Sequence, residues 1–146
     1  MHVERTFTVE TPVEAVFDYL SDFTHTEQWD PGTIETVRVS GDGGVGTTYR
    51  NTSEFMGRRT ELTYETLLVE RPGRLRFRGR NKTATATDTL TFNPAGDGSS
   101  TEVRYRADFE FTFPVNLVAP LVVRPRLAKL ADETVDQLSR TLETLP

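Results

Sequence analysis

The stretch VRYRADFEF, residues 103–111, alternates apolar and charged side chains without a break. One parity carries only valine, alanine and aromatic residues, while the other carries arginine, aspartate and glutamate. A period of two is typical of a β-strand that has one face in the core and the other in water. The stretch therefore predicts a strand of an antiparallel sheet whose apolar face needs a cover.

The cover is predicted by the last part of the chain. Apolar residues recur there at steps of three and four, which is the spacing of one helix face; they are Leu127, Leu130, Ala131, Val135, Leu138, Leu142 and Leu145. The opposite face is charged, with Lys129, Asp132 and Asp136 among its residues. A long helix with one apolar stripe must lie on something, and the apolar face of the sheet is the only large candidate.

The segment upstream of residue 103 predicts more strands of the same sheet. The ranges with a period of two are 33–40, 47–56, 60–70, 75–81 and 83–92, and the last strand spans 101–111. Turn signals such as Gly41–Gly44, Pro72-Gly73 and Asn93–Gly98 separate them. Short links between consecutive strands imply an antiparallel meander.

The N-terminal part predicts a strand followed by two short helices. Residues 3–9 alternate, although Arg5 stands on the apolar parity. Thr11 is predicted to cap a helix in which Pro12 takes the first position and which continues to Leu20. Ser21 and Asp22 then cap a second short helix over residues 23–28. The whole order indicates one α+β domain over residues 1–146.

Composition excludes several classes of function. The chain has 146 residues, a net charge of −5, no cysteine and only two histidines. These counts argue against nucleic-acid partners, disulfides, a cysteine nucleophile and a histidine zinc site, so we expect no metal and no cofactor. The absence of an apolar signal segment or span favours a soluble cytoplasmic protein, either monomer or homodimer.

Several motifs resemble one known family. They are TPVEAVFDYL (11–20), QWDP (28–31), GVGT (44–47), LTYE (62–65) and RLRFRG (74–79). With the C-terminal helix, they resemble the SRPBCC superfamily, also called START-like or helix-grip proteins, and within it the small bacterial polyketide cyclase/dehydrase group. The resemblance implies a helix-grip fold, in which a curved seven-stranded antiparallel sheet wraps around the last helix and encloses a cavity.

The resemblance also implies a range of functions. Members bind lipids, sterols, polyketides, quinones or plant hormones; some catalyse aromatisation or dehydration without a cofactor, and others act as co-chaperones. None of the motifs above is a catalytic signature.

Asp88 is the candidate for chemistry. It shares a parity with alanines and with Leu90 and Phe92, so it is predicted to face the interior with small residues beside it. Burial would raise its pKa and suit it to act as a general acid or base. The alternatives are a hydrogen bond to a ligand hydroxyl, or a structural role in which an arginine or tyrosine pairs with Asp88.

Further candidates for ligand contact are aromatic or polar residues on inward parities. They are Trp29, Tyr49, Tyr64, Phe77, Asn81, Tyr105 and Phe109. Phenols could orient a polyketide oxygen, and Trp29 is expected near the cavity mouth. For the aromatic residues, simple core packing is an equal alternative. For Asn81 the alternative is a turn position, and Arg59 is better explained as a solvated turn residue than as an anion site.

Four arginines, at positions 74, 76, 78 and 80, share one face of a strand. They favour a solvated sheet surface neutralised by Glu61 and Glu65 of the preceding strand.

The sequence thus leaves three hypotheses. The first is a binding protein for a hydrophobic, partly oxygenated small molecule. The second is a cyclase or dehydratase using Asp88, with Tyr64 orienting an oxyanion. The third is a protein-interaction module that uses the arginine face or residues 114–125.

Overall fold

In the computed structural model, which describes residues 1–146, seven strands form one antiparallel sheet in the order β1-β7-β6-β5-β4-β3-β2. The strands are β1 (His2–Val9), β2 (Thr33–Ser40), β3 (Thr48–Phe55), β4 (Arg58–Glu70), β5 (Arg74–Arg80), β6 (Ala84–Ala95) and β7 (Ser100–Phe111). Strands β2 to β7 pair in chain order, and β1 closes the sheet on β7. The predicted meander is confirmed.

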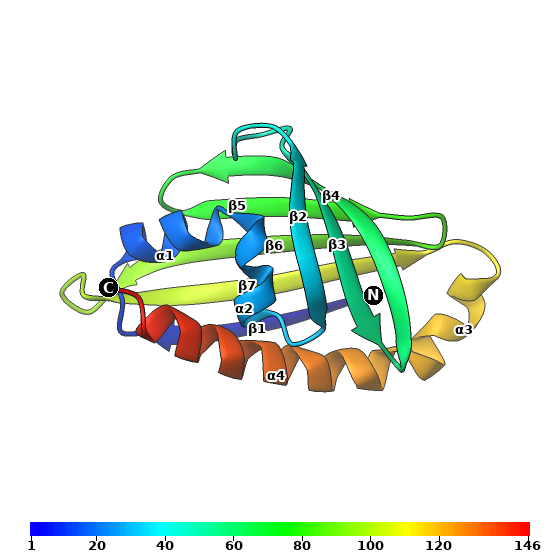
Figure 1. Cartoon of the computed structure of the whole chain (residues 1–146). Coiled ribbons are helices and arrows are strands. Elements are labelled where there is room, and N and C mark those ends of the chain that lie inside the picture. The colour runs from blue at the N-terminus through cyan, green and yellow to red at the C-terminus, as the bar shows by residue number, and fades with distance from the viewer.

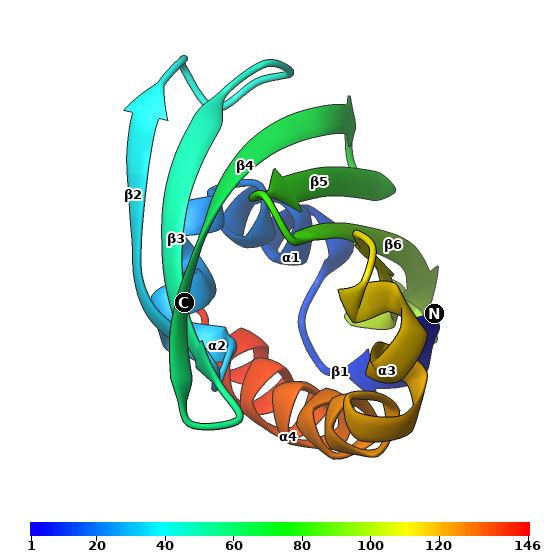
Figure 2. The ribbon, with the colours of Figure 1, turned by 90° about the vertical axis from the view of Figure 1, so that its right-hand side faces the viewer.

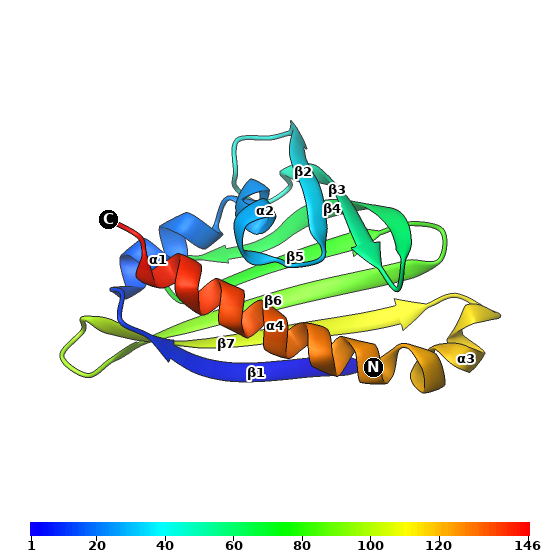
Figure 3. The same cartoon turned by 60° about the horizontal axis from the view of Figure 1, so that its bottom comes forward.

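The helices lie on one side of this sheet. They are α1 (Val13–Leu20), α2 (Thr26–Trp29), α3 (Val115–Val122) and α4 (Arg124–Glu143), with a short 3-10 turn at Phe23–His25 before α2. The sheet curves, and α4 lies across its open side while α1 and α2 lie at one end (Figure 1 and Figure 2). Seen from below, α4 runs along the sheet from the α3 end to the α1 end (Figure 3). The helix-grip fold is therefore confirmed.

The core is concentrated at the α1 end. Leu138 and Leu142 of α4 are fully buried there with α1 and the ends of β6 and β7. Phe17 of α1 meets Phe92 of β6 edge to face, with ring centroids 6.1 Å apart. Burying large apolar side chains contributes about 1.5–3 kcal/mol each, so this end anchors the fold.

Two polar contacts fasten α4 to the N-terminal strand and its exit. Arg5 breaks the apolar parity of β1 because its guanidinium reaches α4, where Nε donates to Asp132 at 2.8 Å. The prediction that Thr11 caps α1 is wrong: Pro12 occupies the N-cap position, and the buried Thr11 hydroxyl donates instead to the carbonyl of Leu142 at 2.8 Å. Thr11 therefore joins the end of α4 to the start of α1.

Helix α3 was not predicted, because Pro114, Pro120 and Pro125 interrupt the apolar pattern of this segment. Pro114 stands at the N-cap of α3, and Pro120 lies inside the helix. Pro125 falls in the first turn of α4, where a proline costs no backbone hydrogen bond. The prolines therefore divide the segment into two helices.

Gly79 is required by a close approach between strands. A β-carbon at this position would lie 2.6 Å from the Tyr64 ring of the neighbouring strand. We expect Gly79→Ala to destabilise the protein by about 1–3 kcal/mol, because the ring cannot give way without displacing its own neighbours. Urea unfolding followed by circular dichroism measures the change.

The matched control is Gly73→Ala. A β-carbon there would find only ordinary contacts at 3.9 Å, so this variant should be as stable as the parent protein or slightly more stable. Equal stability of the two variants would contradict the role given to Gly79.

Candidate functional site

The concave face of the sheet has small side chains around one carboxyl group. Asp88 of β6 is 8% exposed, and its direct neighbours in register are Phe77 on β5 and Ala107 on β7. Its next neighbour along the same face of β6 is Ala86, which pairs with Gly79. The inward placement expected for Asp88 therefore agrees with the structure, and its neighbours on this face are two alanines and Phe77.

Tyr64 approaches this region from β4. Its ring lies across Gly79, and its ring centroid is 4.5 Å from that of Phe23. Phe23 in turn packs on Phe77 at 4.6 Å and on Tyr49 at 5.6 Å. Phe23 thus lies at the centre of a packed aromatic cluster. Tyr64 is the member of this cluster whose ring lies across Gly79, next to the strand that carries Asp88.

Tyr105 approaches from β7. It pairs in register with Leu90, which places it diagonally across from Asp88 on the same face. The ring of Trp29, at the end of α2, meets the Tyr105 ring edge to face at 6.3 Å. Trp29 is buried in the core cluster, so it belongs to the wall of this region.

Asp30 is a second carboxylate of the site, and sequence reasoning missed it. It follows Trp29 directly and accepts hydrogen bonds from the Gly32 backbone at 3.2 Å and from the Thr33 hydroxyl at 2.8 Å. Asn51 of β3 donates to Thr33 at 3.1 Å. The only signal in the sequence was its place before Pro31 and Gly32, because the loop conformation decides where the side chain lies.

The hydrogen bonds around Asp30 continue into the frame of the domain. Asn51 also donates to the hydroxyl of Thr36 at 2.8 Å, and Thr36 shares a 2.6 Å hydrogen bond with Thr26 of α2. The network joins α2, β2 and β3. It therefore holds the exit of α2, and with it Asp30, at a defined place.

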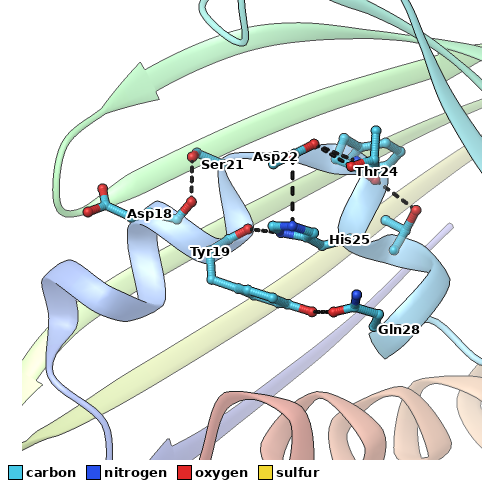
Figure 4. Close-up of polar contacts among 9 residues, drawn as sticks. Asp18, Tyr19, Ser21, Asp22, Thr24, His25 and Gln28 are labelled. Carbon is cyan, nitrogen blue, oxygen red and sulfur yellow. Dashed lines mark hydrogen bonds and ion pairs between the residues drawn. The ribbon is translucent and has the colours of Figure 1, made fainter. Parts of the chain in front are cut away.

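Contacts between α1 and α2 fix the other end of the short helix (Figure 4). The rings of Tyr19 and His25 stack at 4.2 Å, and His25 Nδ1 lies 2.6 Å from the Tyr19 carbonyl oxygen. The Tyr19 hydroxyl donates to the side-chain oxygen of Gln28, and the backbone carbonyl of Gln28 accepts from the Gln137 side chain of α4 at 2.8 Å. The short helix is thus tied to both α1 and α4.

Burial and like charge change the ionisation of these groups. The pKa of Asp88 is raised to about 7, mainly by desolvation and also by the charge of Asp30, while a hydrogen bond from the Tyr105 hydroxyl acts to lower it. Of the two partners expected for a structural role, an arginine does not contribute, whereas a tyrosine, Tyr105, does. Desolvation likewise raises the pKa of Asp30, and it raises the pKa values of Tyr64 and Tyr105 well above the usual range. Both phenols are therefore hydrogen-bond donors at neutral pH.

The remaining predicted residues separate into two groups. Tyr49 and Phe77 are fully buried in the aromatic cluster, whereas Phe109 is half-buried on the concave face. Of the two positions expected for Asn81, the inward one is wrong and the turn position is confirmed: the residue is exposed in the β5–β6 turn, where its side-chain oxygen accepts from the backbone of Thr83 and Ala84 at 2.8 Å. The turn needs that acceptor, which explains the residue.

The charges of the four arginines of β5, at positions 74, 76, 78 and 80, are partly neutralised. Arg78 lies 3.6 Å from Glu65, Arg74 donates to Glu70 at 2.8 Å, and Arg76 donates to the Thr89 hydroxyl at 3.2 Å. Glu65 therefore has the predicted cross-strand role. Glu61 does not, because the pairing of β4 with β5 begins at Thr63, opposite Arg80, and Glu61 lies before it. Arg59 is exposed at the start of β4.

A groove of about 240 Å³ opens beside Asp30. Three elements line it: the loop residues Pro31 and Gly32, the β3–β4 hairpin at residues 54–56, and α4 with Arg126, Lys129, Leu130 and Glu133. Asp30 precedes these loop residues in the chain, but neither it nor Asp88 is part of the lining.

No cluster of three or more histidine or acidic side chains has a geometry that could hold a metal ion. None of the helices is both long and apolar enough to cross a bilayer.

The model of the family described as "Polyketide cyclase / dehydrase and lipid transport" matches residues 1–143. The chain belongs to this family. No curated protein sequence matches the chain.

Solved structures support the same assignment at the level of the fold. The Zhui aromatase/cyclase from Streptomyces sp. R1128 superposes with a TM-score of 0.82 at 16% identity, covering 98% of this chain and 93% of that one. A protein from Thermus thermophilus gives 0.76 at 22% identity, covering 98% and 94% of the two chains. A START superfamily protein from Mycobacterium smegmatis gives 0.73 at 20% identity, covering 97% and 94%. The chain is thus a START-like member of the cyclase/dehydrase and lipid-transport family.

The ionisation of Asp88 predicts a pH-dependent stability. Its native pKa is raised from 3.8 to about 7. Between these values the native state binds more protons than the unfolded state, so stability falls as pH rises through this window. Above pH ~7 the destabilisation is complete and is on the order of 4 kcal/mol. Asp88→Asn removes it, so the variant should gain stability relative to the parent protein as pH rises from ~4 to ~8.

Urea unfolding at both pH values measures this difference. The control is Asp136→Asn on the exposed face of α4, which should change stability equally at both. A stability difference for Asp88→Asn that does not vary with pH would contradict the raised pKa.

Proposed function

We propose that residues 1–146 form a single cytoplasmic binding domain for a hydrophobic, partly oxygenated small molecule, lipid-like or polyketide-like. The ligand would lie between the sheet and α4, with its oxygens toward Asp88, Tyr64, Tyr105 and Asp30. The observation that carries the proposal is a buried carboxyl group without a cation, set among small and aromatic side chains. A buried carboxylate without a cation is costly, and a ligand hydroxyl would add a hydrogen bond to the one that Tyr105 provides.

The exposure of the concave face supports the proposal. At the α3 end, the inward-facing residues Leu62, Ala84, Phe109 and Phe111 are only half-buried, in contrast to the fully buried core at the α1 end. Apolar walls that keep contact with solvent, together with a few convergent polar groups, are typical of small-molecule sites.

Filling the space beside Asp88 tests the site. Ala86→Leu places a larger side chain on the concave face next to the carboxyl group, and it should weaken binding of the neutral dye Nile red by roughly tenfold or more. Fluorescence titration measures the affinity, and native mass spectrometry of the purified protein shows whether a ligand co-purifies.

Thr87→Leu is the matched control, because it adds bulk on the opposite face of the same strand. It should leave dye binding unchanged. If the parent protein does not bind the dye and carries no small molecule, or if both variants bind as the parent does, the proposed site is wrong.

A second candidate function is catalysis, and the pKa of Asp88 is the observation that favours it. A carboxyl group with a pKa of about 7 can both accept and return a proton near neutral pH. In a cyclisation with dehydration, its carboxylate would remove a proton from the carbon between two carbonyl groups. The enolate carbon would then form the new carbon–carbon bond to a ketone carbon, whose oxygen takes this proton from the acid and becomes a hydroxyl, while Tyr64 or Tyr105 donates to the enolate oxygen. The carboxylate would next remove the second proton of the same carbon and return it to the hydroxyl, which leaves as water.

Asp88→Asn separates binding from catalysis. If Asp88 is the acid and base, this variant should lower turnover of a linear poly-β-ketone by about 10²-fold or more, with Nile red affinity nearly unchanged. Product analysis by liquid chromatography measures turnover, and Asp136→Asn again serves as the control. Turnover equal to that of the parent protein would remove the catalytic role and leave the binding function in place.

A further inference from the structure

The segment around α3 exposes a group of large apolar side chains, here called the α3 patch. Its members are between 50% and 81% exposed; they are Phe113, Leu117, Val118, Leu121 and Val122. The patch lies at the end of the molecule opposite α1, where α3 projects beyond the sheet (Figure 1 and Figure 3). Contiguous apolar surface of this kind marks an interaction site.

The patch is one face of a helix whose other face is packed. Leu117 and Leu121 are one turn apart, and so are Val118 and Val122, while Ala119 is buried. The entrance to the helix is fixed to the sheet, because the Thr112 backbone donates to the carbonyl of Thr83 at 2.9 Å. The exposed face is therefore held in place without contributing its own side chains to the core.

The charge around the patch is opposite to that of the whole protein. Residues 111–131 contain no acidic side chain and three basic ones, whereas the chain carries a net charge of −5. Arg124 and Arg126 follow α3 directly and are exposed, and Lys129 lies one turn further on, 3.9 Å from Glu133. Lys82 adjoins the start of the segment, since the Thr112 hydroxyl donates to its carbonyl at 3.3 Å.

We propose that the α3 patch docks on the surface of an anionic lipid bilayer. In this arrangement α3 lies in the plane of the membrane, its apolar face enters the boundary between headgroups and acyl chains, and Arg124 and Arg126 contact lipid phosphates. An apolar helix face beside basic residues is what such surfaces bind. No helix here can span the bilayer, so the contact is peripheral.

A second copy of the chain fits the patch less well. Five residues are few against the roughly 20–30 a side of a stable protein interface. A two-fold symmetric contact would also set residues 111–131 against their own copy, and this segment has no acidic side chain to pair with Arg124 or Arg126. An anionic bilayer has a charge opposite to that of Arg124 and Arg126, and binding to it does not require an interface of roughly 20–30 residues.

The docking itself does not depend on the ligand-binding proposal.

Co-sedimentation with vesicles tests the proposal. The full chain should bind vesicles of phosphatidylcholine mixed with phosphatidylglycerol more strongly than pure phosphatidylcholine vesicles, and added salt should weaken the binding. The double variant L117S/L121S should bind the anionic vesicles roughly tenfold or more weakly. The double variant R124S/R126S should lose about fivefold per charge together with most of the salt dependence.

Matched controls replace equally exposed residues elsewhere on the surface. V39S/V45S removes two exposed valines, and R50S/R104S removes two exposed arginines outside the patch; both should bind vesicles as the parent protein does. All four double variants should keep the parent's unfolding temperature, because none of the replaced side chains is buried.

Two results would overturn the docking proposal. One is a parent protein that stays in the supernatant with anionic vesicles, or an L117S/L121S variant that binds them equally well. The other is a dimer in sedimentation velocity that L117S/L121S dissociates, which would assign the patch to a second copy. Nile red titration without vesicles is run in parallel: normal dye binding by L117S/L121S shows that loss of docking is separate from loss of the ligand site.

Discussion

Burial of one face of α4 against the concave side of the sheet is the constraint on which the structure depends. The helix is 20 residues long, and Leu127, Ala131, Leu138 and Leu142 form its buried stripe. A curved antiparallel sheet leaves one apolar face that must be removed from water, and no other element is long enough to cover it. Where α1 adds its own apolar face the core is closed, whereas at the α3 end α4 alone bridges the sheet.

The strands and α4 could be predicted because their signals are local. Apolar residues recur at every second position in a strand and at every third or fourth position in a helix, and both patterns lie within one element. Positions set by distant contacts could not. Thr11 looks like a helix cap, yet its hydroxyl serves the carbonyl of Leu142, more than a hundred residues away. Asn81 has an inward parity, yet the turn requires its oxygen. The apolar residues of α3 lacked a readable period because prolines interrupt them.

The residues of the candidate site divide in the same way, into those that a local pattern predicts and those that distant contacts position. The alternation of side chains along β6 alone predicted that Asp88 faces inward with alanines beside it, because every second side chain of a strand points to the same face. Asp30 gave no such signal, because hydrogen bonds from Gly32 and Thr33 set its orientation, and Thr33 is held in turn by Asn51 of another strand, so the contacts are not visible in a local pattern. The effect of the Asp30 charge on the pKa of Asp88 is therefore a property of the folded chain.

The energetics of Asp88 link these observations to function. A carboxyl group whose pKa is raised to about 7 mainly by desolvation destabilises the native state at neutral pH, and an asparagine of similar shape would avoid this. A fold that tolerates such a group must obtain its stability elsewhere, and the closed core at the α1 end supplies that stability. The end of the domain with half-buried walls, the groove and the exposed face of α3 contributes less to stability. Its surfaces are therefore free to meet a ligand and a membrane.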